Sequence, residues 1–198
     1  MSHHVTEKSG VIILAAGQSQ RFGGQKLLEK INGKEMILHS IQAITQAGLH
    51  YKIFTQHPAL EAFLHQQHIP FFHSIQAKQG MGATLAEAIN SLSDWSSCLI
   101  TLADKHYIQP STYQQVHTHL TQSNIVVPTY QHQAGHPVGF QQHFFPQLNQ
   151  LSGDQGAKKI LQQHPSKVTY LPCLDQGILQ DIDRPEDIVY DVSQTKYR

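Results

Sequence analysis

The chain has 198 residues, enough to bury a substantial core, and its 14 Lys and Arg residues balance its 14 Asp and Glu residues. That balance gives no electrostatic basis for a nucleic-acid or membrane partner. No apolar run approaches the roughly 18 residues of a membrane span, and the polar residues 1–10 lack the core of a signal peptide.

We therefore expect a cytoplasmic protein with one domain over residues 1–198 and a flexible tail over residues 1–9, with a two-lobed chain as the alternative. Cys98 and Cys173 lack metal-ligand spacing, which favours buried thiols in a reducing compartment. The 15 histidines are scattered without a third ligand near any pair, so we attribute them to compositional bias and surface positions rather than to a metal site.

The first predicted element is a strand over 11–14, a short run rich in β-branched residues without polar alternation. Such a run suits a parallel strand that is covered on both faces. A loop of small residues follows, and it contains Gly17, Gly23 and Gly24. Ligands of open α/β sheets bind beyond the carboxyl ends of the strands, where backbone N–H groups can surround a phosphate. This loop is therefore predicted to bind a phosphate chain.

The spacing of this loop differs from that of two common phosphate loops. A dinucleotide fingerprint has glycines at G-x-G-x-x-G, and a kinase-type loop has Gly-Lys followed by Ser or Thr. Neither pattern occurs here. Instead, Arg21 and Lys26 lie five residues apart, so two cations can reach different phosphates of one triphosphate. A glycine-rich turn with solvated cations is the alternative.

Strands and helices then alternate along the chain. In order, we expect a helix over 35–47 ended by Gly48, a strand over 51–55, a helix over 58–67, a short strand over 69–73, a helix over 81–92, a strand over 98–102 and helices over 110–120 and 157–164. This alternation predicts an α/β fold of three α/β/α layers around a mainly parallel, Rossmann-like sheet, to which we add a small β-hairpin insertion.

A second candidate segment lies at the start of the predicted helix over 81–92. Gly80, Met81, Gly82 and Thr84 form a small-residue turn there, and a helix start has backbone N–H groups free for a base edge or a phosphate. An ordinary helix start with Thr84 near the cap is the alternative.

Asp104 stands directly beyond the predicted strand over 98–102. A carboxylate in this place often caps the next helix, but that helix is predicted to begin only near Pro110. Asp104 can instead hold Mg²⁺, a hard cation that prefers carboxylate and phosphate oxygens and keeps several waters.

The carboxyl third contains three further polar segments, Gly135–Phe140, Gly153–Lys158 and Asp181–Asp187. In the last of them, Asp183 suits the cap of a helix that opens with a proline and has acidic residues in its first turn. We expect Asp181 to be a second metal carboxylate, with Asp183 as the alternative.

In this order, the segments resemble those of the MobA-like nucleotidyltransferases from residue 11 to about residue 189. The first loop of that family has the signature L-A-[AG]-G-x-S-x-R-[MF]-G-x-x-K. Nine positions match it: Leu14, Ala15, Ala16, Gly17, Ser19, Arg21, Phe22, Gly23 and Lys26. The family's L-[GA]-D-x-P segment is matched up to Asp104, but His106 replaces its proline. In its G-[ML]-S-x-S segment, Gly82 and Thr84 stand at the serine positions, so one hydroxyl is lost.

The resemblance implies the fold of the nucleotide-diphospho-sugar transferases and Mg²⁺-dependent nucleotidyl transfer, with Arg21, Lys26 and Asp104 as catalytic residues. The nucleotide would be bound by Leu14, Ala15, Ala16, Gly17, Ser19, Arg21, Gly23, Gly24, Lys26, Gly80, Met81, Gly82 and Thr84. The phosphate acceptor would be bound by Gly135, His136, Pro137 and Asp154, and the metal by Asp104 and Asp181.

Within this family, alanine at the position of Ala16 goes with cytidine and glycine with guanine. The chain looks most similar to the molybdenum cofactor cytidylyltransferases, which implies CTP and a molybdopterin-type acceptor, and a transient molybdoenzyme or chaperone partner. Two alternatives stay open. One is a cytidylyltransferase for methylerythritol phosphate or another small phosphate acceptor, although that enzyme usually has a basic residue near Asp181. The other is a carrier of molybdopterin or a nucleotide that performs no catalysis.

Overall fold

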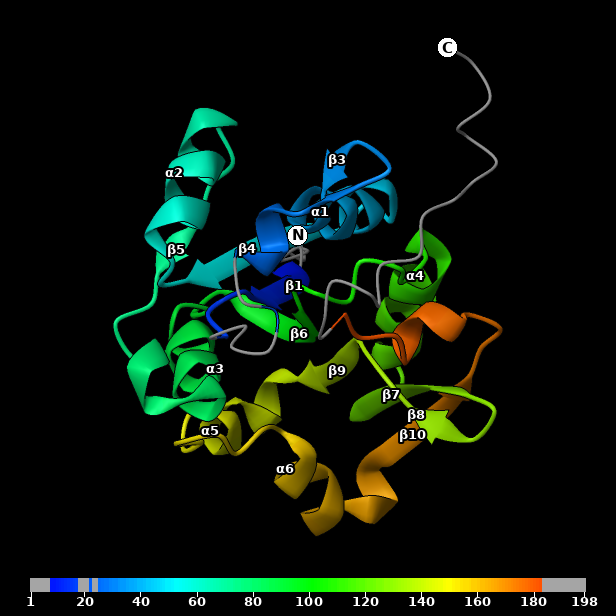
Figure 1. Ribbon diagram of the computed structural model, residues 1–198. Coiled ribbons are helices and arrows are strands. Elements are labelled where there is room, and N and C mark those ends of the chain that lie inside the picture. Colours follow the sequence, from blue (N-terminus) through cyan, green and yellow to red (C-terminus); the bar gives the residue numbers. More distant parts are fainter. Residues whose placement is uncertain (1–7, 18–21, 23–24, 183–198) are drawn as a thin grey trace, which may run out of the picture.

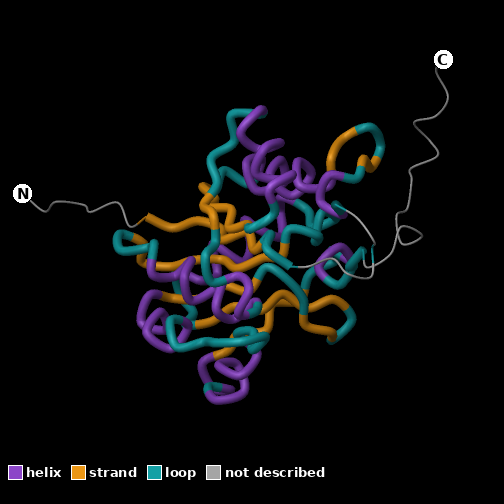
Figure 2. The backbone as a smooth tube through the Cα atoms, turned by 60° about the vertical axis from the view of Figure 1, so that its left-hand side comes forward, coloured by secondary structure: helices purple, strands orange, loops and turns teal. Residues whose placement is uncertain are grey.

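The computed structural model describes residues 8–17, 22 and 25–182. Strands run through its middle, and helices lie on both sides of them (Figure 2). The main sheet is formed by β1 (Lys8–Leu14), β4 (His50–Thr55), β5 (Phe72–His73), β6 (Trp95–Leu102), β7 (Ile125–Tyr130), β8 (Gln133–Ala134), β9 (Val138–Gln141) and β10 (Val168–Pro172). Its order is β10-β7-β9-β6-β1-β4-β5, and β8 pairs with β7 (Figure 1).

The sheet is mainly parallel, as predicted. β1 pairs in parallel with β4 on one side and with β6 on the other. The exception at its centre is β9, which runs antiparallel to both β6 and β7, so that Val138 lies level with Ile100 of β6. A small hairpin of β2 (Lys30–Ile31) and β3 (Lys34–Glu35) lies outside this sheet. Its Asn32-Gly33 turn has positive φ at both residues, which such two-residue hairpin turns require.

The helices are α1 (Met36–Gln46), α2 (Pro58–Gln66), α3 (Met81–Asn90), α4 (Pro110–Leu120), α5 (Phe145–Leu148) and α6 (Lys158–Gln163). Alternate residues of β1 point to opposite faces of the sheet. Ile13 packs in a core with residues of α1, α2 and α4, whereas Ile12 packs in a second core with residues of α3, α5 and α6. Both faces of β1 are thus buried, which explains its unbroken apolar sequence and confirms the three layers.

Several boundaries differ from the prediction. Lys8 and Ser9, expected in the flexible tail, extend β1: Lys8 pairs with Asp94 at 2.6 Å, and Ser9 Oγ lies 2.6 Å from His117 Nε2. The strand expected over 69–73 is limited to β5, because Pro70 has no N–H to donate to a ladder.

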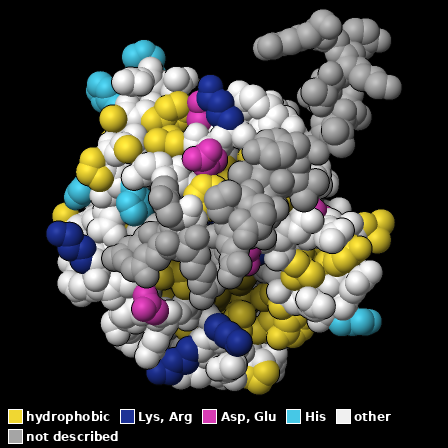
Figure 3. Space-filling model, in the orientation of Figure 1, with side chains coloured by type: hydrophobic (Ala, Val, Ile, Leu, Met, Phe, Trp, Pro, Cys, Tyr) yellow, Lys and Arg dark blue, Asp and Glu magenta, His cyan; other side chains and the backbone are white. Residues whose placement is uncertain are grey.

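The four strands of the carboxyl half, β7 to β10, were not predicted at all. Of the two thiols expected to be buried, Cys98 is buried and Cys173 is partly exposed. Among the described residues, no helix is both long enough and apolar enough to span a membrane. On the face drawn in Figure 3, acidic and basic side chains are interspersed.

Candidate functional site

A pocket of about 600 Å³ opens at the carboxyl ends of β1 and β6. This volume is typical of small-molecule sites. Five segments supply its lining: the exit of β1, the turn that begins at Lys26, the start of α3 with the residues just before it, the exit of β6 and the loop that contains Asp154. The lining residues are Leu14, Ala15, Ala16, Gly17, Lys26, Leu27, Ala77, Lys78, Gln79, Gly80, Met81, Thr84, Leu102, Ala103, Asp104 and Asp154.

The chain leaves β1 between its two neighbouring strands. The Ala15 N–H donates to the Phe54 carbonyl at 2.8 Å, and the Ala103 N–H donates to the Leu14 carbonyl at 3.0 Å. A Cβ added at Gly17 would meet no atom of the described residues within 4 Å, so that this glycine borders open space among them. No packing within the described residues requires a glycine here. The open space leaves room for a ligand beside the backbone.

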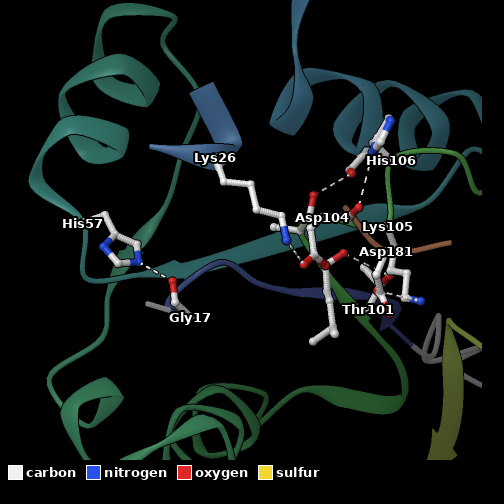
Figure 4. A network of polar contacts seen from close by, with 11 residues as sticks. Gly17, Lys26, His57, Thr101, Asp104, Lys105, His106 and Asp181 are labelled. Carbon is white, nitrogen blue, oxygen red and sulfur yellow. Dashed lines mark hydrogen bonds and ion pairs between the residues drawn. The ribbon is translucent and has the colours of Figure 1, made fainter. Parts of the chain in front are cut away.

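The floor of the pocket contains an ion pair. Lys26 Nζ donates to Asp104 Oδ2 at 2.7 Å, and the lysine is only 5% exposed (Figure 4). The other carboxylate oxygen, Asp104 Oδ1, is buried and has no hydrogen-bond partner among the described residues. A buried carboxylate oxygen without a partner is costly unless something binds it. The structure thus brings together a predicted phosphate cation and a predicted metal carboxylate that are 78 residues apart in the chain.

A second lysine–aspartate pair lies beside the first. Lys105 Nζ is 2.8 Å from Asp181 Oδ1, and their side chains are 6% and 51% exposed. The sequence analysis assigned no role to Lys105. Because its ammonium group is buried, a nearby carboxylate is needed to offset its desolvation. Across the described residues, no group of three or more His, Cys, Asp or Glu side chains could hold a metal ion.

His106, which stands where the family has a proline, holds the same turn together. Its Nδ1–H donates to the Asp104 carbonyl at 3.3 Å, and its ring centroid lies 3.8 Å from that of Tyr107. Burial lowers the pKa of His106 to about 4, so its imidazole is neutral at neutral pH. The His106 side chain therefore bonds the backbone of this turn, and its other ring nitrogen, Nε2, is buried without a hydrogen-bond partner among the described residues.

The opposite wall of the pocket lies at the start of α3, where we expected backbone N–H groups that are free to bind a ligand. Two of these N–H groups are instead bonded within the protein. The Gly82 N–H donates to the Gly153 carbonyl at 2.8 Å, and the Thr84 N–H donates to the Gly80 carbonyl at 3.2 Å. Thr84 is not a cap, because its hydroxyl donates backwards to the same Gly80 carbonyl. Gly82 is also absent from the described pocket lining. A Cβ there would lie 2.4 Å from the Gln155 carbonyl oxygen, which explains why the family's serine cannot be kept.

The predicted acceptor residues are divided between two places. Asp154 lines the pocket beside Gly80, whereas Gly135, His136 and Pro137 are outside its described lining. His136 Nδ1–H donates to the Ile100 carbonyl at 3.3 Å, so this segment lies near the end of β6. Burial lowers the pKa of His136, and Lys105 lowers it further, whereas Asp181 and Asp104 act in the opposite direction. This segment is therefore within electrostatic reach of both lysine–aspartate pairs.

Part of the predicted site lies outside the described residues, namely Ser19, Arg21, Gly23 and Gly24 of the first loop and the alternative metal carboxylate Asp183. Phe22 of the same loop is described, and it is buried in a small core with Ile31, Met36 and Ile182.

The sequence analysis missed some lining residues, among them Ala77 and Lys78. Both lie within three residues of Gly80, and this closeness to the candidate segment is the signal that could have found them. Two side chains behind the pocket, Gln56 and His57, hydrogen-bond the carbonyls of Ala16 and Gly17. No local pattern marks Gln56 and His57, because their role depends on the pairing of β1 with β4.

Comparison with known proteins gives a consistent result. The family model described as "MobA-like NTP transferase domain" matches residues 11–168. The purine catabolism protein PucB of Bacillus subtilis is 26% identical over 189 residues, which cover 89% of this chain and 92% of PucB. A probable molybdenum cofactor guanylyltransferase of Thermococcus sibiricus is 58% identical over 36 residues, or 18% of each chain.

Solved structures with low identity share the fold. The crystal structure of Rv0371c from Mycobacterium tuberculosis superposes with a TM-score of 0.78 at 22% identity, covering 91% of this chain and 95% of that one. Its manganese complex superposes with a TM-score of 0.69 at 19% identity, covering 84% and 88%. Molybdopterin-guanine dinucleotide biosynthesis protein A from Archaeoglobus fulgidus superposes with a TM-score of 0.65 at 16% identity, covering 90% and 94%.

Proposed function

This chain belongs to the MobA-like NTP transferase family, and we propose that it transfers CMP from CTP to the phosphate of a molybdopterin-type acceptor, releasing pyrophosphate. The observation that carries the proposal is the ion pair of Lys26 and Asp104, 2.7 Å apart on the floor of the pocket. A nucleotidyl transfer needs a cation for the phosphates and a carboxylate for a metal at one place. Both groups lie beside the backbone of Ala16 and Gly17, where a triphosphate would be bound.

The residues present fit a magnesium ion. Asp104 Oδ1 is a buried carboxylate oxygen without a hydrogen bond in the described chain, and Asp181, which pairs with the next residue, Lys105, offers a second carboxylate. Mg²⁺ is commonly held by one or two carboxylates, with water and substrate phosphates completing its shell. When bound, it would neutralise charge on the phosphates and polarise the α-phosphate.

The side chains of the site position two anions and offset their charge. Lys26, together with Arg21 of the same loop, would bind the triphosphate. A phosphate oxygen of the acceptor attacks the α-phosphorus in line. A new P–O bond to the acceptor forms as the bond from the α-phosphorus to the leaving oxygen breaks. The attacking oxygen is already anionic, so no general base is needed. Positioning and electrostatic stabilisation account for most of the lowering of the barrier in such transfers.

The choice of cytidine rests on Ala16, which stands where guanine-using relatives of the family have glycine. The choice of acceptor rests on the Gly-His-Pro segment at 135–137 and on Asp154. Asp181 argues against methylerythritol phosphate as the acceptor, because the enzymes for that substrate usually have a basic residue near this position.

A thermal-shift assay with CTP, GTP, ATP and UTP, each with and without Mg²⁺, tests the nucleotide. Stabilisation by CTP that depends on the metal is expected, and indifference to all four nucleotides would overturn the proposal. Pyrophosphate release with a molybdopterin-type acceptor then tests the reaction. Metal-dependent binding of CTP without pyrophosphate release would support a carrier instead of an enzyme.

Two substitutions test the ion pair, Lys26→Gln and Asp104→Asn. Each variant keeps a polar side chain of similar size. Asp104→Asn keeps an oxygen that can accept from the ammonium group of Lys26, which is buried and would otherwise lose this partner. We expect each to lower turnover by on the order of 100-fold or more. The matched controls are Lys8→Gln and Asp94→Asn, which break an exposed pair of the same kind with a separation of 2.6 Å. If both site variants kept near-normal pyrophosphate release, the assigned roles would be wrong.

A further inference from the structure

We propose that Gln56 and His57 are positioning residues for the nucleotide, because they hold the backbone of the phosphate-binding loop in its working orientation. The inference rests on the proposed function, since it concerns how that loop binds a triphosphate. Neither residue lies in a segment that matches the family signature.

Both side chains bind carbonyls of the loop directly after β1. Gln56 Nε2 donates to the Ala16 carbonyl at 3.2 Å, and His57 Nε2–H donates to the Gly17 carbonyl at 2.8 Å. Figure 4 shows the second of these bonds, with the imidazole directed at Gly17. The ladder between β1 and β4 has its last backbone bond at Ala15. Beyond that last backbone bond, the two side chains therefore connect the residues that follow β1 to the residues that follow β4.

The orientation of a carbonyl fixes the N–H group of the same peptide. In a trans peptide the two point in opposite directions. When the Ala16 carbonyl is held towards the turn between β4 and α2, the Gly17 N–H must point away from that turn. Gly17 lines the pocket, so a Gly17 N–H that points away from the turn can meet an oxyanion there. A donor that is oriented before binding loses less conformational entropy when the ligand arrives.

The turn that carries these side chains is itself well fixed. The His57 N–H donates to Thr55 Oγ1 at 3.2 Å, and Thr55 is fully buried. Pro58 follows and restricts His57 to an extended backbone, with φ −93° and ψ 111°.

His57→Phe and Gln56→Leu remove the two donors, and His57→Gln restores one at a similar place. His65→Phe is the matched control, because His65 is exposed on the neighbouring α2. The affinity of each variant is measured by calorimetry, with Mg²⁺ and whichever triphosphate stabilises the unaltered protein.

We expect His57→Phe to raise the dissociation constant about tenfold and Gln56→Leu about fivefold, as the loss of one oriented hydrogen bond each predicts. His57→Gln and His65→Phe should stay within about twofold of the unaltered protein, and the melting temperature without nucleotide should not change. KM for the nucleotide should rise while kcat is kept, because the loop holds the phosphates before and during transfer.

Two failures can be told apart. If the unaltered protein binds no triphosphate, the proposed function and this inference are both overturned. If it binds one and the two donor-removing variants bind it equally well, only the positioning role is overturned. A loss that His57→Gln does not rescue, or that comes with a lower melting temperature, would indicate a purely structural role and would also overturn the inference.

Discussion

The two walls of the pocket both depend on glycine, but in opposite ways. At the exit of β1, a Cβ on Gly17 would meet no atom of the described residues within 4 Å. At the start of α3, a Cβ on Gly82 would lie 2.4 Å from the Gln155 carbonyl oxygen, and one on Gly80 would lie 2.4 Å from the Gly153 carbonyl carbon. The first glycine leaves space that a ligand can fill, whereas the other two let one backbone segment rest on another.

Because of this difference, we expect the glycine of the β1 wall to matter for ligand binding and the glycines of the α3 wall to matter for folding. A side chain added at the β1 wall should affect the ligand and leave the protein intact. A side chain added at the α3 wall should push Gly153 and its neighbours away and destabilise the protein before any ligand is present. Measurements of stability and affinity on the same variants can therefore test the comparison.

The largest effect is expected from Gly82→Ser, which introduces the serine found in the resembling family. The new Cβ would collide with backbone atoms, and the Gly82 bond to the Gly153 carbonyl would be strained. We expect a loss of about 3 kcal/mol in the free energy of unfolding, from overpacking and a weakened hydrogen bond. Urea denaturation measures this value. Unchanged stability would mean that the α3 wall has room for a side chain.

Gly80→Ala should be the next most damaging change. Gly80 has φ +107°, where side chains are strained, in addition to its contact with Gly153. The matched control is Gly33→Ala, because Gly33 also has positive φ, +81°, but has open space around its Cβ position. We expect about 1 kcal/mol for the control and about 1 kcal/mol more for Gly80→Ala. Equal losses in urea denaturation would show that the contact contributes nothing.

Gly17→Ala should have no such cost. Its effect on the free energy of unfolding should stay within about 0.5 kcal/mol, because no neighbour is displaced. The methyl group would instead occupy space beside the phosphate-binding backbone and raise the dissociation constant for nucleotide about tenfold, or about 1.4 kcal/mol. Calorimetry with nucleotide and Mg²⁺ checks the affinity. Normal affinity in this variant would mean that the open space beside Gly17 is not used.

The smallest effect is expected from Asp154→Asn. Asp154 is an exposed member of the α3 wall, and we assign it to the acceptor. Steady-state kinetics should give a KM for the acceptor about threefold higher, as expected for a change at an exposed polar contact, with the affinity for nucleotide unaltered. A change in nucleotide affinity alone would move Asp154 to the nucleotide side of the pocket.

Much of the fold was predictable from the sequence because the signals are local. The apolar run of β1 and the span of α4 follow from hydrophobic pattern, and Pro110 marks the helix start that was predicted and found. Two of the missed strands of the carboxyl half have weak local signals, because β8 is only two residues long and β10 is an exposed edge strand whose apolar pattern is weak. Their assignment depends on pairing with β7, which is a property of the folded chain.

In the candidate site, likewise, the residues could be predicted but the contacts between them could not. Lys26 and Asp104 were both named from their positions at strand exits, and the structure places them in one ion pair. That contact could not be predicted, because it joins two loops across the β1–β6 pairing. The bond between Gly82 and Gly153 escaped prediction for the same reason, since the loop that fills the space beside α3 comes from a distant part of the chain.

The direction of β9 has a consequence for how this protein could change its substrate. For β1 and β6, the residues that reach the pocket edge come after the strand. Because β9 runs the other way, the residues that reach this edge come before it, at 135–137. Inserting or deleting residues between Ala134 and Val138 would therefore change the segment that we assign to the acceptor, while Phe140 stays anchored in the interior. If that assignment holds, a change of length at this one point would alter the choice of acceptor without altering the residues after β1 or the core.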